Sequence, residues 1–161
     1  MRGSNIPVLH HSNLFKEFTM PHQISVFLEN KPGKLERVTG LMAEGSINIR
    51  AITIADSGDF GILKILVDDP KEAYNILTRN GLVVAYREVV AIKINDTPGA
   101  LLIIAQILQR HGINIDDAYG FVMESGTAAV FVIQVKDPAG TSAILTEEGI
   151  ELLKDEDLYY L

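Results

Sequence analysis

Alternating apolar and polar positions predict strands at residues 24–28 and 47–54, and residues 60–67 form a nearly continuous apolar run typical of a central strand. A helix is predicted between the first two strands by apolar residues at helical spacing: Leu35, Val38, Leu41 and Met42. Asp69 and Pro70 open a second helix, and residues 82–86 form a short last strand. The order strand–helix–strand–strand–helix–strand is the ferredoxin-like arrangement.

The second half of the chain repeats this predicted order of elements. Residues 29–35, Glu-Asn-Lys-Pro-Gly-Lys-Leu, correspond to residues 95–101, Asn-Asp-Thr-Pro-Gly-Ala-Leu. Each motif is followed by Ile-Asn-Ile, with Asn48 and Asn114 at the same 66-residue offset. The second copy predicts strands at 90–94 and 128–135, helices at 101–108 and 139–147, and, by alignment of the tail, an edge strand at 155–161.

The repeat predicts an α+β chain of two small domains, at residues 20–88 and 89–161, with antiparallel sheets. A unit of this size buries only about 60% of the surface of its unfolded chain, so the copies should pack on each other or on a second chain. Residues 1–19 are interpreted as a leader or vector-derived segment, because Met1-Arg2-Gly3-Ser4 resembles the start of an expression vector. His10 and His11 are therefore not expected to bind metal.

Composition narrows the class of function. The net charge of −7 disfavours nucleic-acid binding, and no apolar run reaches the roughly 18 residues of a membrane span. The chain has no cysteine, which excludes disulfides and thiol nucleophiles. Because no secretory segment is visible, a cytoplasmic location is expected.

The sequence predicts no catalytic site and no cofactor. His111 is the one histidine of the folded part besides His22, and its position at a helix C-terminus has a structural explanation. The nucleophile, nucleotide-binding and zinc motifs of common enzymes are absent. Adjacent carboxylates are interpreted as solvated surface, since neighbours in sequence do not face each other. A divalent cation at Asp116 and Asp117 is left open.

The two Pro-Gly turns are the strongest candidates for a binding site. We predict Asn30 or Lys31 near the helix N-cap and Pro32 in the first turn. Unpaired amides at a helix start suit a carboxylate, and Gly33 and Gly99 let a ligand approach. The amide of Asn30 can donate and accept, whereas an ionised Asp96 only accepts and would prefer an ammonium. Ordinary capping explains the same residues without a ligand.

Asn48 and Asn114 are the second pair of candidates. Each lies between two isoleucines at a strand start, where asparagine is a poor strand former. A half-buried amide needs a hydrogen-bond partner, which is either the neighbouring backbone or a polar ligand.

These motifs, above all in residues 24–54, resemble the ACT domain, and the resemblance covers residues 22–161. ACT domains are small βαββαβ modules that bind amino acids and regulate metabolic enzymes. The resemblance implies a free-standing, non-catalytic tandem ACT protein that binds a small amino acid to control amino-acid metabolism. It also implies a homodimer or larger oligomer with the sheets joined side by side.

By this resemblance, the ligand lies between the Pro-Gly turn of one unit and the asparagine of an adjoining unit. The site residues it implies are Asn30, Pro32, Gly33, Leu35 and Asn48 for the first repeat, and Asp96, Pro98, Gly99, Leu101 and Asn114 for the second. Asp96 in place of asparagine and Thr97 in place of a basic residue weaken the second pattern. Apolar neighbours suit a small or branched aliphatic side chain.

Three other functions are weighed. The first fifty residues also resemble the small subunit of acetolactate synthase, which implies a regulatory subunit docked to a biosynthetic enzyme. RNA binding through the sheet is disfavoured by negative charge and by the lack of stacking aromatics. A hydrolase of the acylphosphatase type lacks its phosphate-binding loop here. The expected partners are thus an amino acid, a second copy and a metabolic enzyme, with neither nucleic acid nor membrane.

Overall fold

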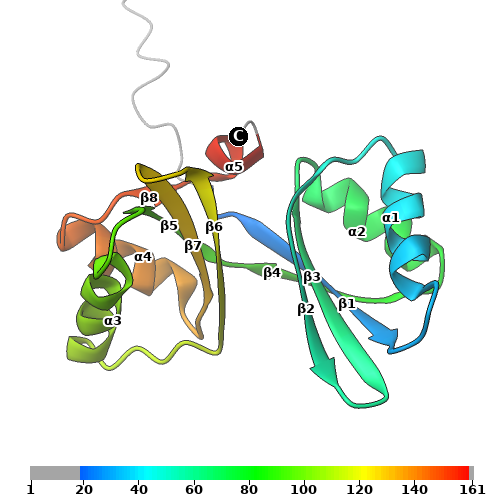
Figure 1. Ribbon diagram of the computed structural model, residues 1–161, viewed down its shortest axis with the longest axis horizontal. Helices are drawn as coiled ribbons and strands as arrows, with labels where there is room; N and C mark the ends of the chain where they lie inside the picture. Colours follow the sequence, from blue (N-terminus) through cyan, green and yellow to red (C-terminus); the bar gives the residue numbers. More distant parts are fainter. Residues whose placement is uncertain (1–18, 160–161) are drawn as a thin grey trace, which may run out of the picture.

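The computed structural model describes residues 19–159, which form two units beside one another (Figure 1). Unit one consists of β1 (His22–Glu29), α1 (Lys34–Glu44), β2 (Ile49–Ser57), β3 (Phe60–Val67), α2 (Pro70–Arg79) and β4 (Val83–Glu88). Unit two consists of β5 (Val90–Asn95), α3 (Ala100–Arg110), β6 (Asp117–Glu124), β7 (Ala128–Gln134), α4 (Pro138–Glu147), β8 (Leu152–Leu153) and a final α5 (Asp155–Tyr159). The predicted leader lies, except for Thr19, outside the described residues.

Each unit contains one four-stranded antiparallel sheet, in the order β2-β3-β1-β4 in unit one and β6-β7-β5-β8 in unit two. In unit one, Val26 of β1 pairs with Leu63 of β3 on one side and Val84 of β4 on the other. The split βαβ order predicted from the repeat is therefore confirmed in both halves. The domain boundary at residues 88 and 89 stays a prediction, and β4 and β5 end and begin around it.

The two helices of each unit cover one face of its sheet. In unit one the buried face consists of alternate strand residues and the inner side of the helices: Ile24, Val26, Leu63, Ile65, Val67, Val38, Met42, Ala73 and Leu77. A matching cluster lies under α3 and α4 in unit two. The period of two in the strands and of about 3.6 in the helices thus produces the core that the sequence predicts.

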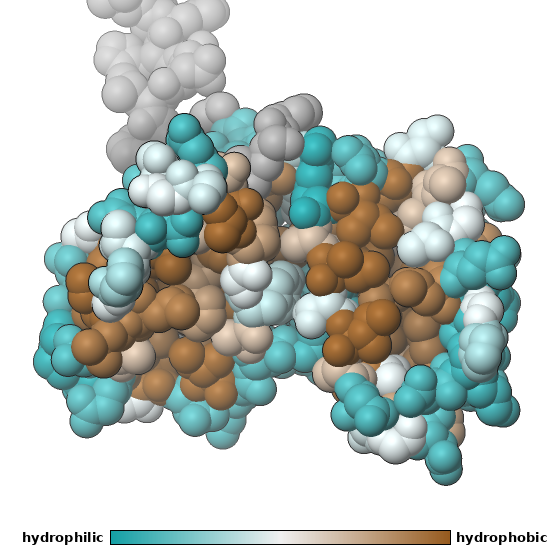
Figure 2. Space-filling view, viewed as in Figure 1, coloured by the Kyte–Doolittle hydropathy of each residue, from teal (hydrophilic) through white to brown (hydrophobic). Residues whose placement is uncertain are grey.

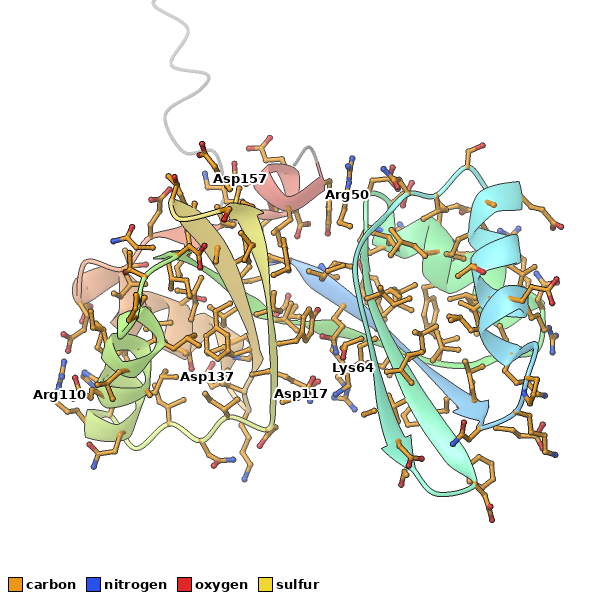
Figure 3. All side chains as sticks on the ribbon, in the orientation of Figure 1. Arg50, Lys64, Arg110, Asp117, Asp137 and Asp157 are labelled. Carbon is orange, nitrogen blue, oxygen red and sulfur yellow. The ribbon has the colours of Figure 1, made fainter. Side chains whose placement is uncertain are left out.

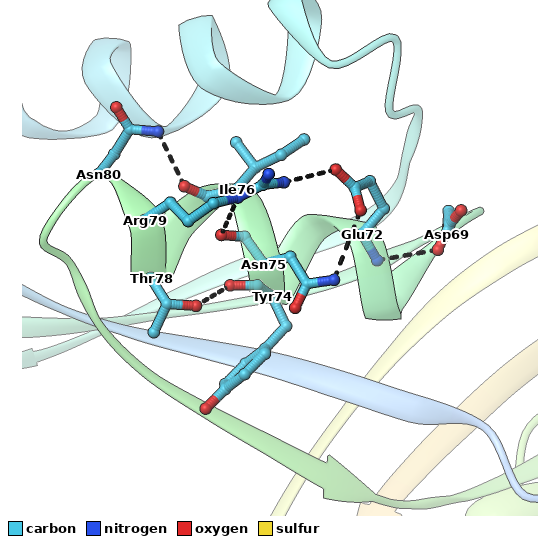
Figure 4. A network of polar contacts seen from close by, with 8 residues as sticks. All are labelled: Asp69, Glu72, Tyr74, Asn75, Ile76, Thr78, Arg79 and Asn80. Carbon is cyan, nitrogen blue, oxygen red and sulfur yellow. Dashed lines mark hydrogen bonds and ion pairs between the residues drawn. The ribbon is translucent and has the colours of Figure 1, made fainter.

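The second helix of each unit begins where the sequence predicts. The Asp69 carboxylate accepts a hydrogen bond from the Glu72 backbone amide at 2.9 Å (Figure 4). Pro70 occupies the first turn of the helix. Asp137 caps α4 in the same way, accepting from the Gly140 amide at 3.0 Å. An Asp-Pro pair satisfies one orphan amide and removes another, so it defines the helix start in both units.

The open faces of the two sheets face each other, with the helices outside (Figure 1). A third buried cluster joins them: Leu66, Val89, Ala91, Val130, Val132, Leu153 and Leu158. Beside it, the Lys64 ammonium lies 2.6 Å from the Asp117 carboxylate, and the two side chains extend toward one another from opposite units (Figure 3). The units therefore form one four-layered body.

The predicted side-by-side joining of the sheets is not made inside the chain. Among residues 19–159 the strands pair only within their own sheet, because the apolar open faces bury each other instead. This arrangement leaves β2 and β6 as edge strands without a neighbour on their outer side. The joining therefore remains a prediction for contacts between copies.

The predicted edge strand at residues 155–161 is wrong for the part that the structure describes. Residues 155–159 form the short helix α5, and the edge strand beside β5 is the two-residue β8. The Asp157 carboxylate accepts from the Lys154 amide at 2.9 Å, which starts the helix. The helix places Leu158, which is fully buried, into the cluster between the units.

Candidate functional site

Both Pro-Gly turns adopt the same backbone conformation. Gly33 has φ 84° and ψ −13°, and the Lys34 amide donates to the Lys31 carbonyl at 3.3 Å. These values describe a type II turn with Pro32 and Gly33 at its centre, where glycine tolerates a positive φ. Gly99 repeats the geometry with φ 91° and ψ −11°.

The predicted helix start was wrong by several residues. The N-cap of α1 is Gly33 rather than Asn30 or Lys31, and Pro32 precedes the helix. The reason is that the type II turn already holds the chain at Pro32, so the helix can begin only after the glycine. No side chain caps the first turn of α1 or of α3. The first-turn amides therefore keep the partial positive charge that an anion would meet.

The second residue of each motif, Asn30 or Asp96, bonds the turn to a hairpin. The Asn30 amide nitrogen donates to the Asp56 carboxylate and to the Gly58 carbonyl, both at 3.3 Å. In unit two the Asp96 carboxylate accepts from the Gly126 amide at 2.7 Å. Asn30 and Asp96 thus perform the same structural task with opposite polarity. The donors of Asn30, which the sequence assigned to a ligand, are already engaged.

A charged cluster adjoins the turn of unit one. The Glu29 carboxylate lies 2.6 Å from the Lys34 ammonium and 3.0 Å from that of Lys31. The hydrogen bond from Lys34, followed by that from Lys31, lowers the pKa of Glu29 to about 2. Both lysines are partly exposed, so the turn of unit one presents cations near its helix start.

The two asparagines lie at the other end of their units. The backbone amide of Asn48 donates to the Asp68 carboxylate at 2.9 Å, and the backbone amide of Asp68 donates to the Asn48 backbone carbonyl at 3.1 Å. The Asn114 side chain donates to the Asp116 carboxylate at 3.1 Å and to the Ile115 carbonyl at 3.3 Å. Both asparagine side chains are exposed rather than half-buried, so each can reach a ligand.

No unit brings its own turn and its own asparagine together. They lie at opposite ends of α1 or α3, and the eleven residues of either helix span about 16 Å. The five predicted site residues of each repeat therefore separate into a turn group and a lone asparagine. Only an adjoining unit could combine them.

A cavity beside Asn114 was missed by the sequence interpretation. It has a volume of about 320 Å³, and its polar lining includes Lys136, Asp137 and Thr141. A comparison of the two repeats could have drawn attention to this place. At a 68-residue offset, Lys136 and Thr141 stand where unit one has Asp68 and Ala73, while Asp137 corresponds to Asp69.

His111 and Asp117, two of the groups that the sequence raised as candidates, are engaged in ion pairs. His111 ends α3, and its Nε2 lies 3.0 Å from the Glu148 carboxylate, which also binds Arg110 at 2.9 Å. The hydrogen bond from His111, followed by that from Arg110, lowers the pKa of Glu148. Residues 19–159 contain no cluster of three potential metal ligands, and Asp117 is paired with Lys64. In the same part of the chain, no helix is long and apolar enough to cross a membrane.

Comparisons with known proteins agree with the repeat. A family model described as an ACT domain pair matches residues 19–161. The structure is similar to that of protein BT0572 from Bacteroides thetaiotaomicron, with 37% identity, a TM-score of 0.83, and coverage of 89% of this chain and 99% of that one. It also shares the fold of the ligand-free regulatory subunit of aspartate kinase from Thermus thermophilus, at 17% identity and a TM-score of 0.60, over 81% of this chain and 93% of that one.

A shorter similarity concerns a curated protein. Over 49 residues the chain is 45% identical to the acetolactate synthase small subunit of Buchnera aphidicola subsp. Baizongia pistaciae. The match covers 30% of this chain and 31% of that subunit, so it spans about a third of the curated relative.

Proposed function

The chain belongs to the ACT domain pair family, and we propose that it is a non-catalytic regulatory module that binds a small amino acid where units of two copies meet. The observation that carries the proposal is the pair of uncapped helix starts at Gly33 and Gly99. Each helix start offers free amides to a carboxylate. The family resemblance places an asparagine beside the ligand, but the asparagine of the same unit lies at the other end of the helix.

Edge strands β2 and β6 are the surfaces through which two copies would meet. An unpaired edge presents free amides and carbonyls and tends to pair with another chain. On the helix side of these edges, apolar side chains are exposed: Ile52 by 47%, Ile54 by 58% and Val122 by 57%. Figure 2 shows apolar side chains gathered over both units on one face of the molecule. Pairing between copies would bury them.

Antiparallel pairing of edges would complete the site. In unit one, Asn48 directly precedes β2, whereas Asn30 is bonded to the hairpin at the far end of β2. An antiparallel neighbour runs in the opposite direction, so its asparagine end lies beside the turn end of the first strand. Unit two has the same geometry, because Asp96 is bonded to the hairpin after β6 and Asn114 precedes that strand. Each turn would therefore meet an asparagine of the other copy.

The chemistry of such a site suits an amino acid. First-turn amides and the helix dipole favour a carboxylate, and the carbonyl oxygen of asparagine accepts from an ammonium. Leu35 and Leu101, which are 41% and 52% exposed, flank the turns and would contact an aliphatic side chain. No metal or cofactor is needed for this binding, and a cytoplasmic location fits the proposed role.

Thermal melting against each of the twenty amino acids tests the proposal. A ligand present at about 100 times its Kd should stabilise the folded state by about 2.7 kcal/mol. We expect at least one small or aliphatic amino acid to raise the Tm, and no shift with any of them at millimolar concentration would exclude the proposal.

The role of pairing is tested by sedimentation. The double variant Ile54→Glu/Val122→Glu should sediment as a monomer, because two charges would be buried at the paired edges. Gln109→Glu, at an exposed position of α3 and outside both edge strands, serves as the control for added charge. A wild-type chain that stays monomeric at micromolar concentration would remove the pairing from the proposal.

A second candidate is a subunit that docks to a biosynthetic enzyme, as the similarity to the acetolactate synthase small subunit suggests. The observation in its favour is an uncovered apolar area on the open face of the first sheet, where Phe27, Phe60 and Val83 are 46%, 60% and 68% exposed. An exposed patch of this kind marks many protein-protein contacts. Co-sedimentation with a purified acetolactate synthase catalytic subunit, weakened by Val83→Asp, would support this candidate; free mixing without a complex would count against it.

A further inference from the structure

The cavity beside Asn114 lies wholly within unit two, between the start of β6, the end of β7 and the start of α4. Figure 3 shows Asp137, one of its lining residues, at this end of the unit. Its volume of about 320 Å³ is at the lower end of the range for small-molecule sites. Ile113 and Ile144 supply part of its apolar wall.

One buried polar group in this cavity lacks a partner. Thr141 is only 3% exposed and lines the cavity. Within residues 19–159 its hydroxyl makes no hydrogen bond, although its backbone amide donates to the Asp137 carbonyl at 3.0 Å. A hydroxyl that lines the cavity and is not engaged by the protein is free to donate to a polar group there.

The polar groups that line the cavity include both hydrogen-bond acceptors and hydrogen-bond donors. The Asp137 carboxylate accepts one amide bond through Oδ1 and keeps capacity to accept from an ammonium. The side-chain nitrogen of Asn114 is engaged by Asp116, which leaves its oxygen to accept as well. Lys136 and the Thr141 hydroxyl can donate to a carboxylate, and no ion pair engages Lys136 in the described part of the chain.

The same place in unit one carries different chemistry. Asp68 stands where unit two has Lys136, and its carboxylate binds the Asn48 amide. Glu72 stands in place of Gly140 and pairs with Arg79 at 2.8 Å (Figure 4). Ala73 replaces Thr141, so the hydroxyl is absent. Unit one therefore lacks both the cation and the buried donor.

Acceptors for an ammonium, donors for a carboxylate and an apolar wall fit one class of ligand. We propose that this cavity binds a free aliphatic α-amino acid as its zwitterion, within a single chain. The proposal takes its ligand class from the proposed function, but it does not need pairing between copies. Unit two would then hold a ligand even when the edge strands are free.

Titration of the isotope-labelled double variant Ile54→Glu/Val122→Glu with L-leucine, followed by amide NMR, tests the proposal apart from pairing. We expect saturable shifts for Asn114, Lys136 and Thr141, and none at the equivalent Asn48, Asp68 and Ala73. Leucinamide lacks the carboxylate and 4-methylpentanoate lacks the ammonium, so each should bind at least about tenfold more weakly than leucine. If 4-methylpentanoate binds as well as leucine, the cavity is an anion site and the proposal is wrong.

Two substitutions locate the binding. Lys136→Met should weaken leucine binding by about tenfold or more, because it removes the charged donor. Lys71→Met, an exposed lysine on α2 of unit one, is the matched control and should change nothing. Thr141→Val keeps the shape of the side chain and should weaken binding by about two- to tenfold, whereas Thr146→Val on the outer side of α4 should not.

The outcomes separate this proposal from the proposed function. Shifts at the cavity in a monomeric variant support the cavity site even if sedimentation shows that the wild-type chain does not pair. Shifts confined to residues 30–35 and 96–101, or their absence throughout the titration, would overturn it. Wild-type melting that responds to leucine while the cavity stays silent would leave only the sites between copies.

Discussion

At their turn ends the two units differ in charge. Unit one gathers Glu29, Lys31 and Lys34 around its helix start, whereas unit two has Asn95, Thr97 and Ala100 at these positions. At their asparagine ends the difference is reversed, because unit two carries Lys136 and an open cavity where unit one carries Asp68. The lysines of this comparison thus lie at the turn end of unit one and at the asparagine end of unit two.

The backbone features that both units share are those the fold requires. The type II turn, the Asp-Pro helix start and the contact from turn to hairpin occur twice with nearly the same geometry. Side chains that do not hold the backbone have diverged. The repeat therefore preserves the backbone, while the side chains that a ligand would meet differ between the two units at both ends.

The shared cluster between the units should show the largest effect. Leu66 is fully buried there, so Leu66→Ala should lower the free energy of unfolding by about 2–5 kcal/mol. Urea denaturation measures the loss, and Val83→Ala at an exposed position of the same sheet should cost less than about 0.5 kcal/mol. Equal effects of the two substitutions would mean that the units do not stabilise each other through this contact.

The two turns should respond alike to loss of glycine. Gly33→Ala and Gly99→Ala should each cost about 1–2 kcal/mol, because an L-residue is strained at their positive φ. Space is not the cause, since no atom lies closer than 4.0 Å to an added Cβ at Gly33 and none within 4 Å at Gly99. Gly40→Ala, inside α1 with free space around it, should instead stabilise by up to about 1 kcal/mol. Thermal unfolding of the three variants would contradict the shared turn if only one turn glycine mattered.

Exchange of the second motif residue, Asn30 or Asp96, should affect the stability of the two units unequally. Asn30→Asp would place a carboxylate against Asp56 and the Gly58 carbonyl, and should cost about 1 kcal/mol. Asp96→Asn should cost only a few tenths, because the amide oxygen can still accept from Gly126. Denaturant midpoints of the pair provide the measurement. The reverse order of costs would show that the two hairpin contacts are not as the structure has them.

The smallest effect concerns pH. The pKa of Glu29 is depressed in the folded state, so its contribution to stability is present above the unfolded pKa of about 4.3 and is lost as pH falls through about 2. Lys34→Met should raise the pKa of Glu29 toward its ordinary value, since Lys34 is the main cause of the shift. NMR titration of the Glu29 carboxyl measures this, with Lys71→Met as the neutral control. An unchanged midpoint in Lys34→Met would remove the assigned cause.

Periodicity and the repeat were sufficient to predict the two sheets and their order. The apolar run at 60–67 became β3, and Asp69 capped α2, because these features depend on local spacing and local chemistry. The N-cap was misplaced because an asparagine before a helix suggests capping, whereas the Pro-Gly pair fixes the turn first. The tail was misplaced because alignment could not show that Leu158 is needed in the cluster between the units.

The candidate site could be predicted only in part. Motif spacing identified the turns and the asparagines, but it could not show that each unit separates them along α1 or α3. How the two sheets are placed depends on which apolar faces pack together. Strands such as β3 are apolar on both faces, so the sequence does not show which face is covered by helices and which by the other sheet. The cavity near Asn114 depends on several single differences between the copies, each of which alone resembles ordinary surface variation.

Amide hydrogen exchange of the edge strands shows whether two copies pair through β2 and β6, which the proposed sites at the turns require. In β2 and β6, the amides that point away from β3 and β7 have no partner strand among residues 19–159. Pairing predicts that these amides are protected at micromolar concentration and lose protection on dilution and in Ile54→Glu/Val122→Glu. If they exchange at the rate of free amides at every concentration, the edges are unpaired and the proposed sites between copies do not form.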